Sequence, residues 1–348
     1  MAAVGGNNNI VRYTYTGAIG EVIPREATHI NMDKGVRIVL EEAFRDFINV
    51  VELICHEGVE KIEEWAFWGC PRLRRVIMPG VKIVEAEAFA NCIALEDVEC
   101  GKLEIIREAA FIACNSLRSI NLQSTRIVKN RAFGRCRALT DVKFGSKLQR
   151  FERCSFLQCP SLERIIIPLK DGLITHVNIF QECGNLKQVD LVDGELHETI
   201  AALHLEDWKN DMNQEIDSIN QILPNASAGI YIDFDDDPVY GEKARAIRRW
   251  IRTVLGKIID YQAEHRLILE EDIATTLELA LPRDIAMNNV LPFLELPSHT
   301  FEVGDDDDVD NDDDMPEERE EEDDLDEEVD DDEDYSMLRE EDGELEGY

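Results

Sequence analysis

The sequence predicts a repeat solenoid in which each turn of about 22–23 residues contributes one parallel β-strand. An α-helical hairpin and a disordered acidic tail are predicted to follow it. Three observations lead to this prediction: a phrase that recurs at nearly constant spacing, a change to helical periodicity after residue 195, and a C-terminal run of Asp and Glu.

The recurring phrase is Ala-Phe-x-x-Cys-x-x-Leu-x-x-Val/Ile, first complete at Ala66, Phe67, Cys70, Leu73 and Val76. With one degenerate copy before it and two looser copies at the end, its phenylalanines are Phe44, Phe67, Phe89, Phe111, Phe133, Phe156 and Phe180. They lie 23, 22, 22, 22, 23 and 24 residues apart. One repeat cannot bury its own apolar face, so constant spacing predicts turns that stack and cover one another.

The apolar residues after each Phe predict the strands of this stack. Equivalent strands are expected to end at Met32, Cys55, Met78, Cys100, Leu122, Phe144, Ile167 and Leu191, which gives about eight rungs over residues 27–194. A second apolar position lies five residues before each Phe, at Val39, Ile62, Val84, Ile106, Val128 and Phe151. Residues 10–15 alternate in polarity and predict a strand within an N-terminal cap, residues 1–26, that closes the first edge.

The cysteines of the phrase stand one per rung, at Cys70, Cys92, Cys114, Cys136, Cys159 and Cys183. Tetrahedral zinc needs four ligands around one point, typically from two close pairs, and the sequence has no Cys-x-x-Cys pair. We therefore expect small buried side chains packed against the Phe stack, with no metal and no cofactor. Disulfides between adjacent rungs are the alternative, and they would need an oxidising setting.

The extended phrase V/I-x-x-I-x-x-x-A-F-x-x-C-x-x-L-x-x-V-x-I-P resembles the leucine-rich repeat subtype of the BspA-like proteins over roughly residues 27–192. Pro79 and Pro168 match its strand-ending proline, whereas Gly101 and Gly145 replace it elsewhere. The resemblance implies a right-handed leucine-rich repeat solenoid that acts as a binding scaffold, with no catalytic residue to carry over. Known members occur as bacterial surface proteins and as intracellular sets in microbial eukaryotes.

Helical periodicity replaces the repeat in residues 195–300. One apolar stripe runs from Leu196 to Leu223 and ends at Pro224, and a longer stripe runs from Ala244 to about Leu281 before Pro282. Two such helices with a short connection predict an antiparallel hairpin, followed by an extended segment at 292–301. The hairpin is expected either to cap the last repeat or to form a homo-oligomer through its apolar stripe.

A basic segment lies on the longer predicted helix, with Lys243, Arg245, Arg248, Arg249, Arg252 and Lys257. The facing helix offers Glu206, Asp207, Asp211, Glu215 and Asp217. Ion pairing within the hairpin, or docking of the acidic tail, is therefore favoured over binding of nucleic acid.

The acidic tail holds most of the net charge of the chain. Residues 305–348 contain 28 Asp and Glu against Arg319 and Arg339, in a chain whose formal net charge is -38. Such a composition offers too little apolar surface to order, so residues 301–348 are predicted to be disordered. A pI near 4.4 argues against direct binding to nucleic acid or to an anionic membrane. Asp residues from Asp306 onward have calcium-loop spacing, but Asn311 replaces the turn glycine, so no ordered calcium site is expected.

The chain shows neither a secretory signal nor an enzyme motif. No basic start followed by an apolar stretch occurs in the first 22 residues, and no run reaches the roughly 18 apolar residues of a membrane span. We therefore expect an intracellular protein, cytoplasmic or nuclear. Phosphate-loop, H-E-x-x-H and G-x-S-x-G motifs are absent from the sequence, so no enzyme is expected.

The leading hypothesis is a non-enzymatic protein–protein interaction scaffold that binds a protein partner through the concave face of the repeats. The candidate contact residues point outward from the strands: Glu52, Ile54, Arg75, Ile77, Asp97, Glu99, Asn121, Asp141, Lys143, Arg164 and Ile166. Cross-strand ion pairs are expected from Arg75 to Glu52 and Asp97, and between Asp141 and Arg164. A solvated face of local pairs is the simpler alternative. A different function would be an acidic-tail chaperone or shield for basic proteins such as histones.

Overall fold

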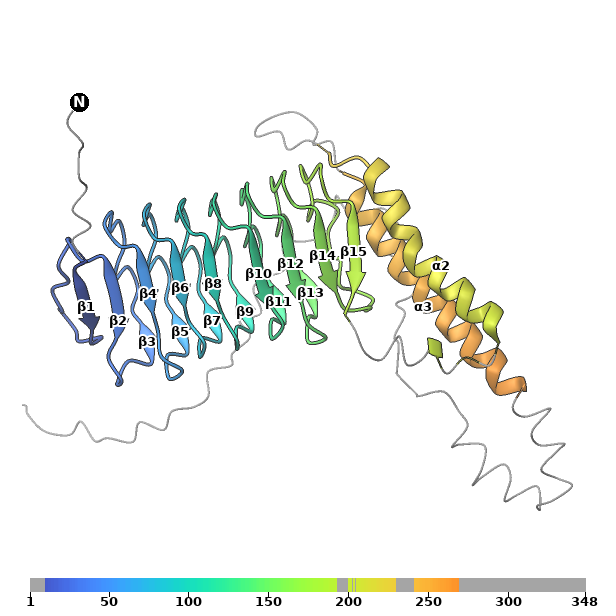
Figure 1. Ribbon diagram of the computed structural model, residues 1–348, viewed down its shortest axis with the longest axis horizontal. Coiled ribbons are helices and arrows are strands. Elements are labelled where there is room, and N and C mark those ends of the chain that lie inside the picture. The colour runs from blue at the N-terminus through green and yellow to red at the C-terminus, as the bar shows by residue number, and fades with distance from the viewer. Residues whose placement is uncertain (1–9, 193–199, 202, 204, 230–240, 269–348) are drawn as a thin grey trace, which may run out of the picture. The chain divides into compact units, whose positions relative to one another are not determined.

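The computed structural model describes residues 10–192, 200, 201, 203, 205–229 and 241–268 of the 348 residues. Within them a β-solenoid is followed by two helices (Figure 1), which confirms the predicted fold class. The predictions for the acidic tail, the segment at 292–301 and the far end of the longer helix lie outside the described residues.

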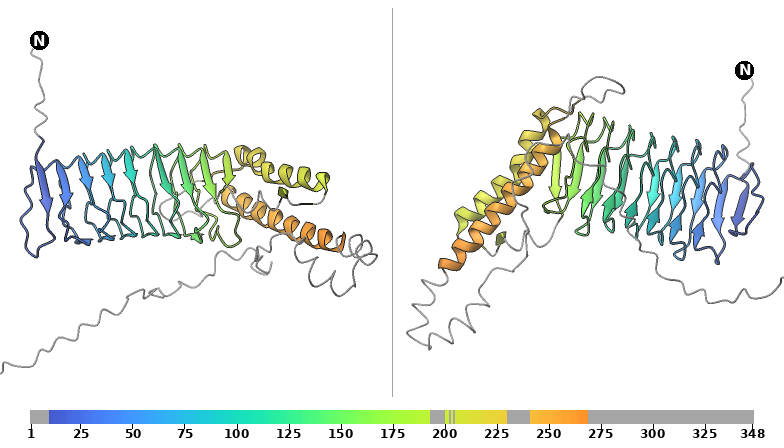
Figure 2. Two further views of the ribbon diagram at one scale, coloured as in Figure 1. Left: turned by 60° about the horizontal axis from the view of Figure 1, so that its bottom comes forward. Right: turned by 180° about the vertical axis from the view of Figure 1, so that it is seen from behind.

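The strands of the main face stack in parallel, side by side in every view (Figure 2). One sheet holds β1 (Arg12–Tyr15), β2 (His29–Met32), β4 (Glu52–Ile54), β6 (Arg75–Ile77) and β8 (Asp97–Glu99); a second holds β10 (Ser119–Leu122), β12 (Asp141–Phe144), β14 (Arg164–Ile167) and β15 (Gln188–Leu191). Residues at equivalent repeat positions pair, as Val76 does with Leu53 and with Val98. The repeat period therefore sets the register.

The hydrogen-bonded sheet of the main face is interrupted once. Within the described residues no ladder joins β8 to β10. At the equivalent position of the preceding rung, the Met78 N–H donates to the Glu99 carbonyl over 2.8 Å. At the interruption it is the Cys100 thiol that donates to the Asn121 carbonyl, over 3.6 Å. The hydrogen bonding between main-face strands is thus broken at this one place, whereas the rungs remain stacked and the sheet on the return path continues across it.

A second parallel sheet runs along the return path of the coil. It contains the two-residue strands β3 (Ile38–Val39), β5 (Lys61–Ile62), β7 (Ile83–Val84), β9 (Ile105–Ile106), β11 (Ile127–Val128) and β13 (Arg150–Phe151). The apolar positions predicted here are the buried second residues of these strands. The sequence did not predict the strands themselves, because two residues are too few to show a period-two pattern.

A third set of contacts between rungs surrounds each phenylalanine. The residues two positions before and two after it adopt positive φ angles between 49° and 68°: Glu42, Asp46, Trp65, Gly69, Glu87, Asn91, Ala109, Ala113, Arg131, Arg135, Cys154, Gln158 and Glu182. Left-handed geometry costs a non-glycine residue about 1–2 kcal/mol. It turns the N–H of Phe67, for example, toward the Ala88 carbonyl of the next rung, 2.8 Å away. Repeated bonds of this kind offset the cost and align the rungs.

The core is a column of phenylalanine rings. Phe44, Phe67, Phe89, Phe111, Phe133, Phe156 and Phe180 stack in turn, with centroids 4.8 to 5.7 Å apart and interplanar angles of 4° to 14°. All seven side chains are buried. Each ring inside the column therefore loses contacts on both faces if it is removed.

Two helices, α2 (Glu206–Ile222) and α3 (Lys243–Ile268), lie side by side and antiparallel (Figure 1). A short 3₁₀ turn, Leu223–Asn225, ends α2. The apolar stripe predicted from Leu196 to Leu223 is not one continuous helix, because Leu205 has extended backbone and α2 begins at Glu206. The start of that stripe, at residues 193–199, lies outside the described residues. Neither α2 nor any other helix of the described part is apolar over a length that could cross a bilayer.

The hairpin closes the open end of the solenoid. The Glu182 N–H donates to the Ala228 carbonyl over 2.9 Å, where the earlier rungs bond to the next turn. The Val189 N–H, on the free side of β15, donates to Oδ1 of Asn220 over 2.9 Å. Backbone groups that a further repeat would satisfy are thus satisfied by the hairpin, which makes it the C-terminal cap.

Basic side chains of α3 supply further cap contacts. The buried Lys243 ammonium donates to the Leu186 and Leu223 carbonyls over 2.6 and 2.7 Å, and burial lowers its pKa. Arg248 donates to the Ile174 and Thr175 carbonyls, both over 2.9 Å.

The prediction that the basic segment pairs within the hairpin is confirmed for Lys257, which lies 2.9 Å from both Asp211 and Glu215. Arg252 instead pairs with Asp171 of the solenoid over 3.2 Å. Arg245 and Arg249 are exposed. The prediction treated the basic residues as one group, but only the packing shows which of them reach the last rung.

Replacing Asp211 with Asn should weaken the hairpin at neutral pH but not in acid. Hydrogen bonds from Tyr261 and Lys257 lower the Asp211 pKa. Its contribution is therefore present above the unfolded-state pKa of about 3.9 and is lost as the pH falls through the lower folded-state pKa. Because Asp211 is partly exposed, we expect a loss below about 1 kcal/mol at pH 7. Urea unfolding at pH 7 and near pH 2 tests this, with exposed Asp207→Asn as the control; an equal loss at both pH values would contradict it.

Candidate interaction surface

All eleven predicted contact residues lie on strands β4 to β14, on the solvent-facing side of the two main sheets. This surface is called the strand face below, and it comprises Glu52, Ile54, Arg75, Ile77, Asp97, Glu99, Asn121, Asp141, Lys143, Arg164 and Ile166. The strand register brings them into two columns, with Glu52 beside Arg75 and Ile54 beside Ile77. The sheet interruption after β8 separates an N-terminal from a C-terminal part of this face.

The N-terminal part is a charge cluster around Arg75. The guanidinium lies 3.7 Å from Glu52 and 3.3 Å from Asp97, as predicted, and it also pairs with Glu99. The hydrogen bond with Glu99 is the main cause that raises the Arg75 pKa. Ile54, at 36% exposure, adds apolar surface at the edge of this cluster.

The C-terminal part differs from the prediction in its ion pair. Asp141 and Arg164 are register partners, yet Arg164 pairs with Asp190 of the last strand instead. Gln188 also donates to the two Asp190 carboxylate oxygens, over 3.1 and 3.0 Å. The predicted Asp141–Arg164 pair was wrong, because the register gives each strand two neighbours and the Arg164 side chain turns toward the later one.

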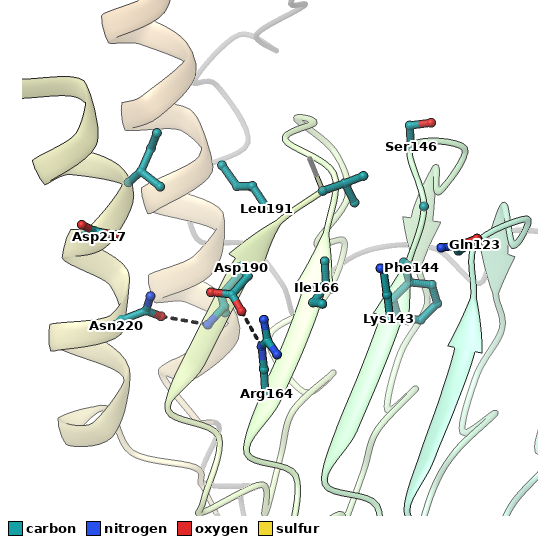
Figure 3. A pocket seen from close by; sticks show the side chains of 14 residues that line it. Gln123, Lys143, Phe144, Ser146, Arg164, Ile166, Asp190, Leu191, Asp217 and Asn220 are labelled. Atoms are coloured by element: carbon teal, nitrogen blue, oxygen red, sulfur yellow. Dashed lines mark hydrogen bonds and ion pairs between the residues drawn. The ribbon is translucent and has the colours of Figure 1, made fainter. Parts of the chain in front are cut away.

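A pocket of about 650 Å³ adjoins this ion pair where α2 lies beside the last strands (Figure 3). Its lining includes three predicted residues, Lys143, Arg164 and Ile166. The other lining residues are Gln123, Phe144, Gly145, Ser146, Val189, Asp190, Leu191, Val192, Ile216, Asp217 and Asn220. Figure 3 shows that the Asn220 bond to Val189 and the Arg164–Asp190 pair border the same space.

The residues from α2 were missed by sequence reasoning. Ile216 belongs to the predicted apolar stripe, and Asp217 was predicted to face the basic helix; neither pattern points to a pocket. Their position depends on how the hairpin packs on β15, which no local pattern records. The lining combines polar side chains, such as Asp217 and Asn220, with the apolar Ile166 and Ile216.

The cysteine ladder forms no site for a metal. Each thiol donates to a phenylalanine carbonyl of the preceding rung, over 2.9 to 3.3 Å, in the pairs Cys70–Phe44, Cys92–Phe67, Cys114–Phe89, Cys136–Phe111, Cys159–Phe133 and Cys183–Phe156. All are free and buried. The part of the chain that the structure describes contains no group of three or more His, Cys, Asp or Glu side chains arranged for a metal ion.

The ladder thiols should resist alkylation in the folded protein. Burial raises the pKa of Cys136 to about 12, so its thiolate fraction at pH 8 is on the order of 10⁻⁴. Native protein treated with iodoacetamide at pH 8 should therefore remain almost unmodified, whereas all nine cysteines should react in concentrated urea. Mass spectrometry counts the adducts. Rapid native modification of the ladder cysteines would contradict the buried arrangement.

A scan against protein families matches the model described as BspA type leucine-rich repeat region, in six copies, over residues 25–127 and 104–204. These overlapping matches together cover residues 25–204, more than half of the chain. A comparison with curated proteins finds no significant match.

Solved structures of other leucine-rich repeat proteins match part of this chain at low identity. A leucine-rich cell surface protein from Faecalibacterium prausnitzii is 18% identical, with 49% of this chain and 62% of that chain covered and a TM-score of 0.32. A leucine-rich repeat protein from Bacteroides ovatus is 18% identical, with 52% and 69% covered and a TM-score of 0.30. The T. pallidum leucine-rich repeat protein is 17% identical, with 57% and 85% covered and a TM-score of 0.29.

Proposed function

Because this chain belongs to the BspA-type leucine-rich repeat family, we propose that it is a non-enzymatic scaffold that binds a protein partner on its strand face. The observation that carries this proposal is the pocket of about 650 Å³ in which Lys143, Arg164 and Ile166 meet α2. An intracellular setting, cytoplasmic or nuclear, is part of the same proposal.

The strand face has the composition of a protein-binding surface. Ile54 and Ile77 adjoin each other beside the Arg75 cluster, and Ile166 lines the pocket. Buried apolar or aromatic anchors surrounded by polar residues carry most of the energy in protein interfaces. We infer that a partner places an apolar side chain in the pocket against Ile166 and Ile216, and extends over the strands toward Ile77.

Polar groups around the pocket would orient such a segment. Lys143 is exposed and makes no ion pair among the described residues, so its ammonium is available to a carboxylate or a carbonyl of the partner. Arg164 is already held by Asp190. A fixed guanidinium loses less side-chain entropy on binding than a mobile one.

The test is affinity capture from cell extract with the full chain and with Ile166→Asp, which puts a charge into the apolar part of the pocket. Partners that bind the strand face should fall at least about tenfold in recovery, since burying an unpaired charge costs several kcal/mol. Ile93→Asp is the matched control, because Ile93 is an exposed isoleucine outside the strand face and the pocket.

Recovery of the same partners by Ile166→Asp and by Ile77→Asp, at wild-type levels, would overturn the strand-face proposal. The alternative of an acidic shield for basic proteins receives no support from the comparisons, and the tail on which it depends lies outside the described residues.

A further inference from the structure

A row of charged residues, away from the strand face, changes sign along the solenoid. We call it the turn row: the three residues that lie two to four positions before each of the first six stacked phenylalanines, Phe44 to Phe156, at 40–42, 63–65, 85–87, 107–109, 129–131 and 152–154. In its first three turns every charged residue is acidic: Glu41, Glu42, Glu63, Glu64, Glu85 and Glu87. The 107–109 turn carries one charge of each sign, and Lys129, Arg131 and Arg153 dominate the turns after it.

The change of sign extends beyond the row. Residues 10–101 contain 10 Lys and Arg against 16 Asp and Glu, whereas residues 102–192 contain 15 against 8. The solenoid is therefore nearly neutral as a whole, although the chain carries a formal charge of -38. Its two halves nevertheless have opposite charge.

The backbone holds these charges in a fixed line. The N–H of Glu42 donates to the Glu64 carbonyl over 3.1 Å, and the N–H of Arg131 donates to the Arg153 carbonyl over 3.2 Å. Successive turns are thus locked at about the 4.8 Å spacing of paired strands. Because the turns are locked, acidic side chains on adjacent turns stay close to one another. Burial, together with nearby carboxylates such as those of Glu41 and Glu87, therefore raises the pKa of Glu64.

Contacts within the chain neutralise only part of the row. Glu85 pairs with Lys61 over 2.9 Å and with Arg107 over 3.6 Å. Glu63 also pairs with Lys61, Glu42 pairs with Arg45, and Lys129 pairs with Glu152 over 3.0 Å. Glu64 and Arg153, in contrast, form no ion pair among the described residues. Beside the charged positions at the middle of the row the side chains are small, the half-buried Ala86 and the buried Ala109, so no bulky side chain stands over the charges there.

We propose that two copies of this chain associate through their turn rows, antiparallel, about a two-fold axis near the 107–109 turn. A gradient from acidic to basic becomes self-complementary when it is rotated by a half-turn about its neutral midpoint. That rotation places Glu87 opposite Arg131 of the second copy and Glu64 opposite Arg153. The parallel arrangement would instead set like charges against each other.

The occupant is a second copy because the gradient is self-complementary, so the same row on another copy matches both of its ends at once. The contact extends over few rungs, so the association should be weak, concentration-dependent and sensitive to salt. The surface is separate from the strand face, and the proposal is independent of partner binding there.

The test is sedimentation velocity on the full chain and on two charge-reversed forms. One form carries Glu64→Lys and Glu87→Lys, and the other carries Arg131→Glu and Arg153→Glu. We expect wild-type dimers at low salt that dissociate at about 0.5 M salt, where the screening length is only a few Å. Each reversed form should be monomeric at concentrations where wild type is dimeric, whereas an equimolar mixture of the two should form a heterodimer.

The mixture protects the test from misfolding, because two unfolded variants would not restore a defined 1:1 species. The control form carries Glu96→Lys and Arg118→Glu, which reverses exposed charges outside the turn row, and it should dimerise as wild type does. Three results would each overturn the proposal: a wild-type chain that stays monomeric at low salt and high concentration, reversed forms that still dimerise, or a mixture that stays monomeric. The last two results would overturn the proposal even if a different protein were found to bind the turn row.

Discussion

Replacing Phe111 with Ala should lower the free energy of unfolding by about 3–5 kcal/mol, the range for large-to-small changes at fully buried aromatic sites. Phe111 is buried and lies in the middle of the column, 5.3 Å from the Phe89 ring and 5.5 Å from the Phe133 ring. Its removal leaves a cavity that neither neighbour can fill, because hydrogen bonds fix the rung spacing. Urea unfolding followed by circular dichroism measures the loss.

Phe180→Ala is the matched control, since its ring is the last of the column: it stacks on Phe156 and meets Phe151 only edge-on. We expect a smaller loss than for Phe111→Ala, because the cavity opens on one side toward the cap. A second result is expected for the central variant. Stability in a solenoid is nearly a sum of rung and neighbour-interface terms. Weakening the central interface should therefore let the N-terminal and C-terminal halves unfold in two separate transitions. Equal losses at Phe111 and Phe180, with one unbroken transition, would show that the ring column is not the main source of cohesion.

Replacing Lys243 with Met should lower the free energy of unfolding by about 2–3 kcal/mol. Its ammonium is buried and bonds the Leu186 and Leu223 carbonyls. The Leu223 carbonyl also accepts from the Ala226 N–H over 3.3 Å, so the loss falls mainly on the Leu186 carbonyl, and an unsatisfied buried carbonyl costs about 1–3 kcal/mol. Burial of the ammonium is itself unfavourable, as its lowered pKa indicates. Methionine does not carry this desolvation penalty, so part of the lost stability is regained. The measurement is again urea unfolding, together with hydrogen exchange of the last rung.

Hydrogen exchange should show the loss at the end of the solenoid first, because Leu186 precedes β15 and the cap covers that edge. Lys187→Met provides the comparison: its ammonium pairs with Glu163 at the exposed surface over 2.8 Å, and exposed pairs contribute about 0–1 kcal/mol. If both substitutions cost the same, or if exchange rises uniformly along the rungs, Lys243 is not the contact that fastens the cap.

Much of the fold could be predicted because each rung repeats the same pattern of buried residues. Phe67, Cys70 and Val76 recur at one spacing, and stacking is the arrangement that buries all of them at once. The positive φ angles could not be predicted in the same way. Gly69 is the only glycine among these positions, and residues such as Trp65 give no local sign of left-handed geometry. Their conformation follows from hydrogen bonds to the next rung.

The candidate site was predicted in position but not in detail. Alternation along each strand places Ile77 and Arg164 on the solvent side whatever the neighbours are. Which carboxylate Arg164 pairs with depends on two flanking strands, and the choice of Asp190 over Asp141 appears only when the side chains are placed. The pocket adds Ile216 and Asn220 from α2, two residues that lie more than twenty positions beyond the end of the last strand.

The sequence by itself determined the stack of rungs, the phenylalanine column, the buried cysteines and the residues that the strands expose. These depend on spacing along the chain, and spacing is what a periodic sequence records. Only the tertiary structure decided how the end of the stack is covered. Lys243 and Asn220 satisfy backbone groups of Leu186 and Val189, residues that are tens of positions away in sequence. Such contacts have no period, so they become visible only when the hairpin lies on the last rung and creates the pocket beside it.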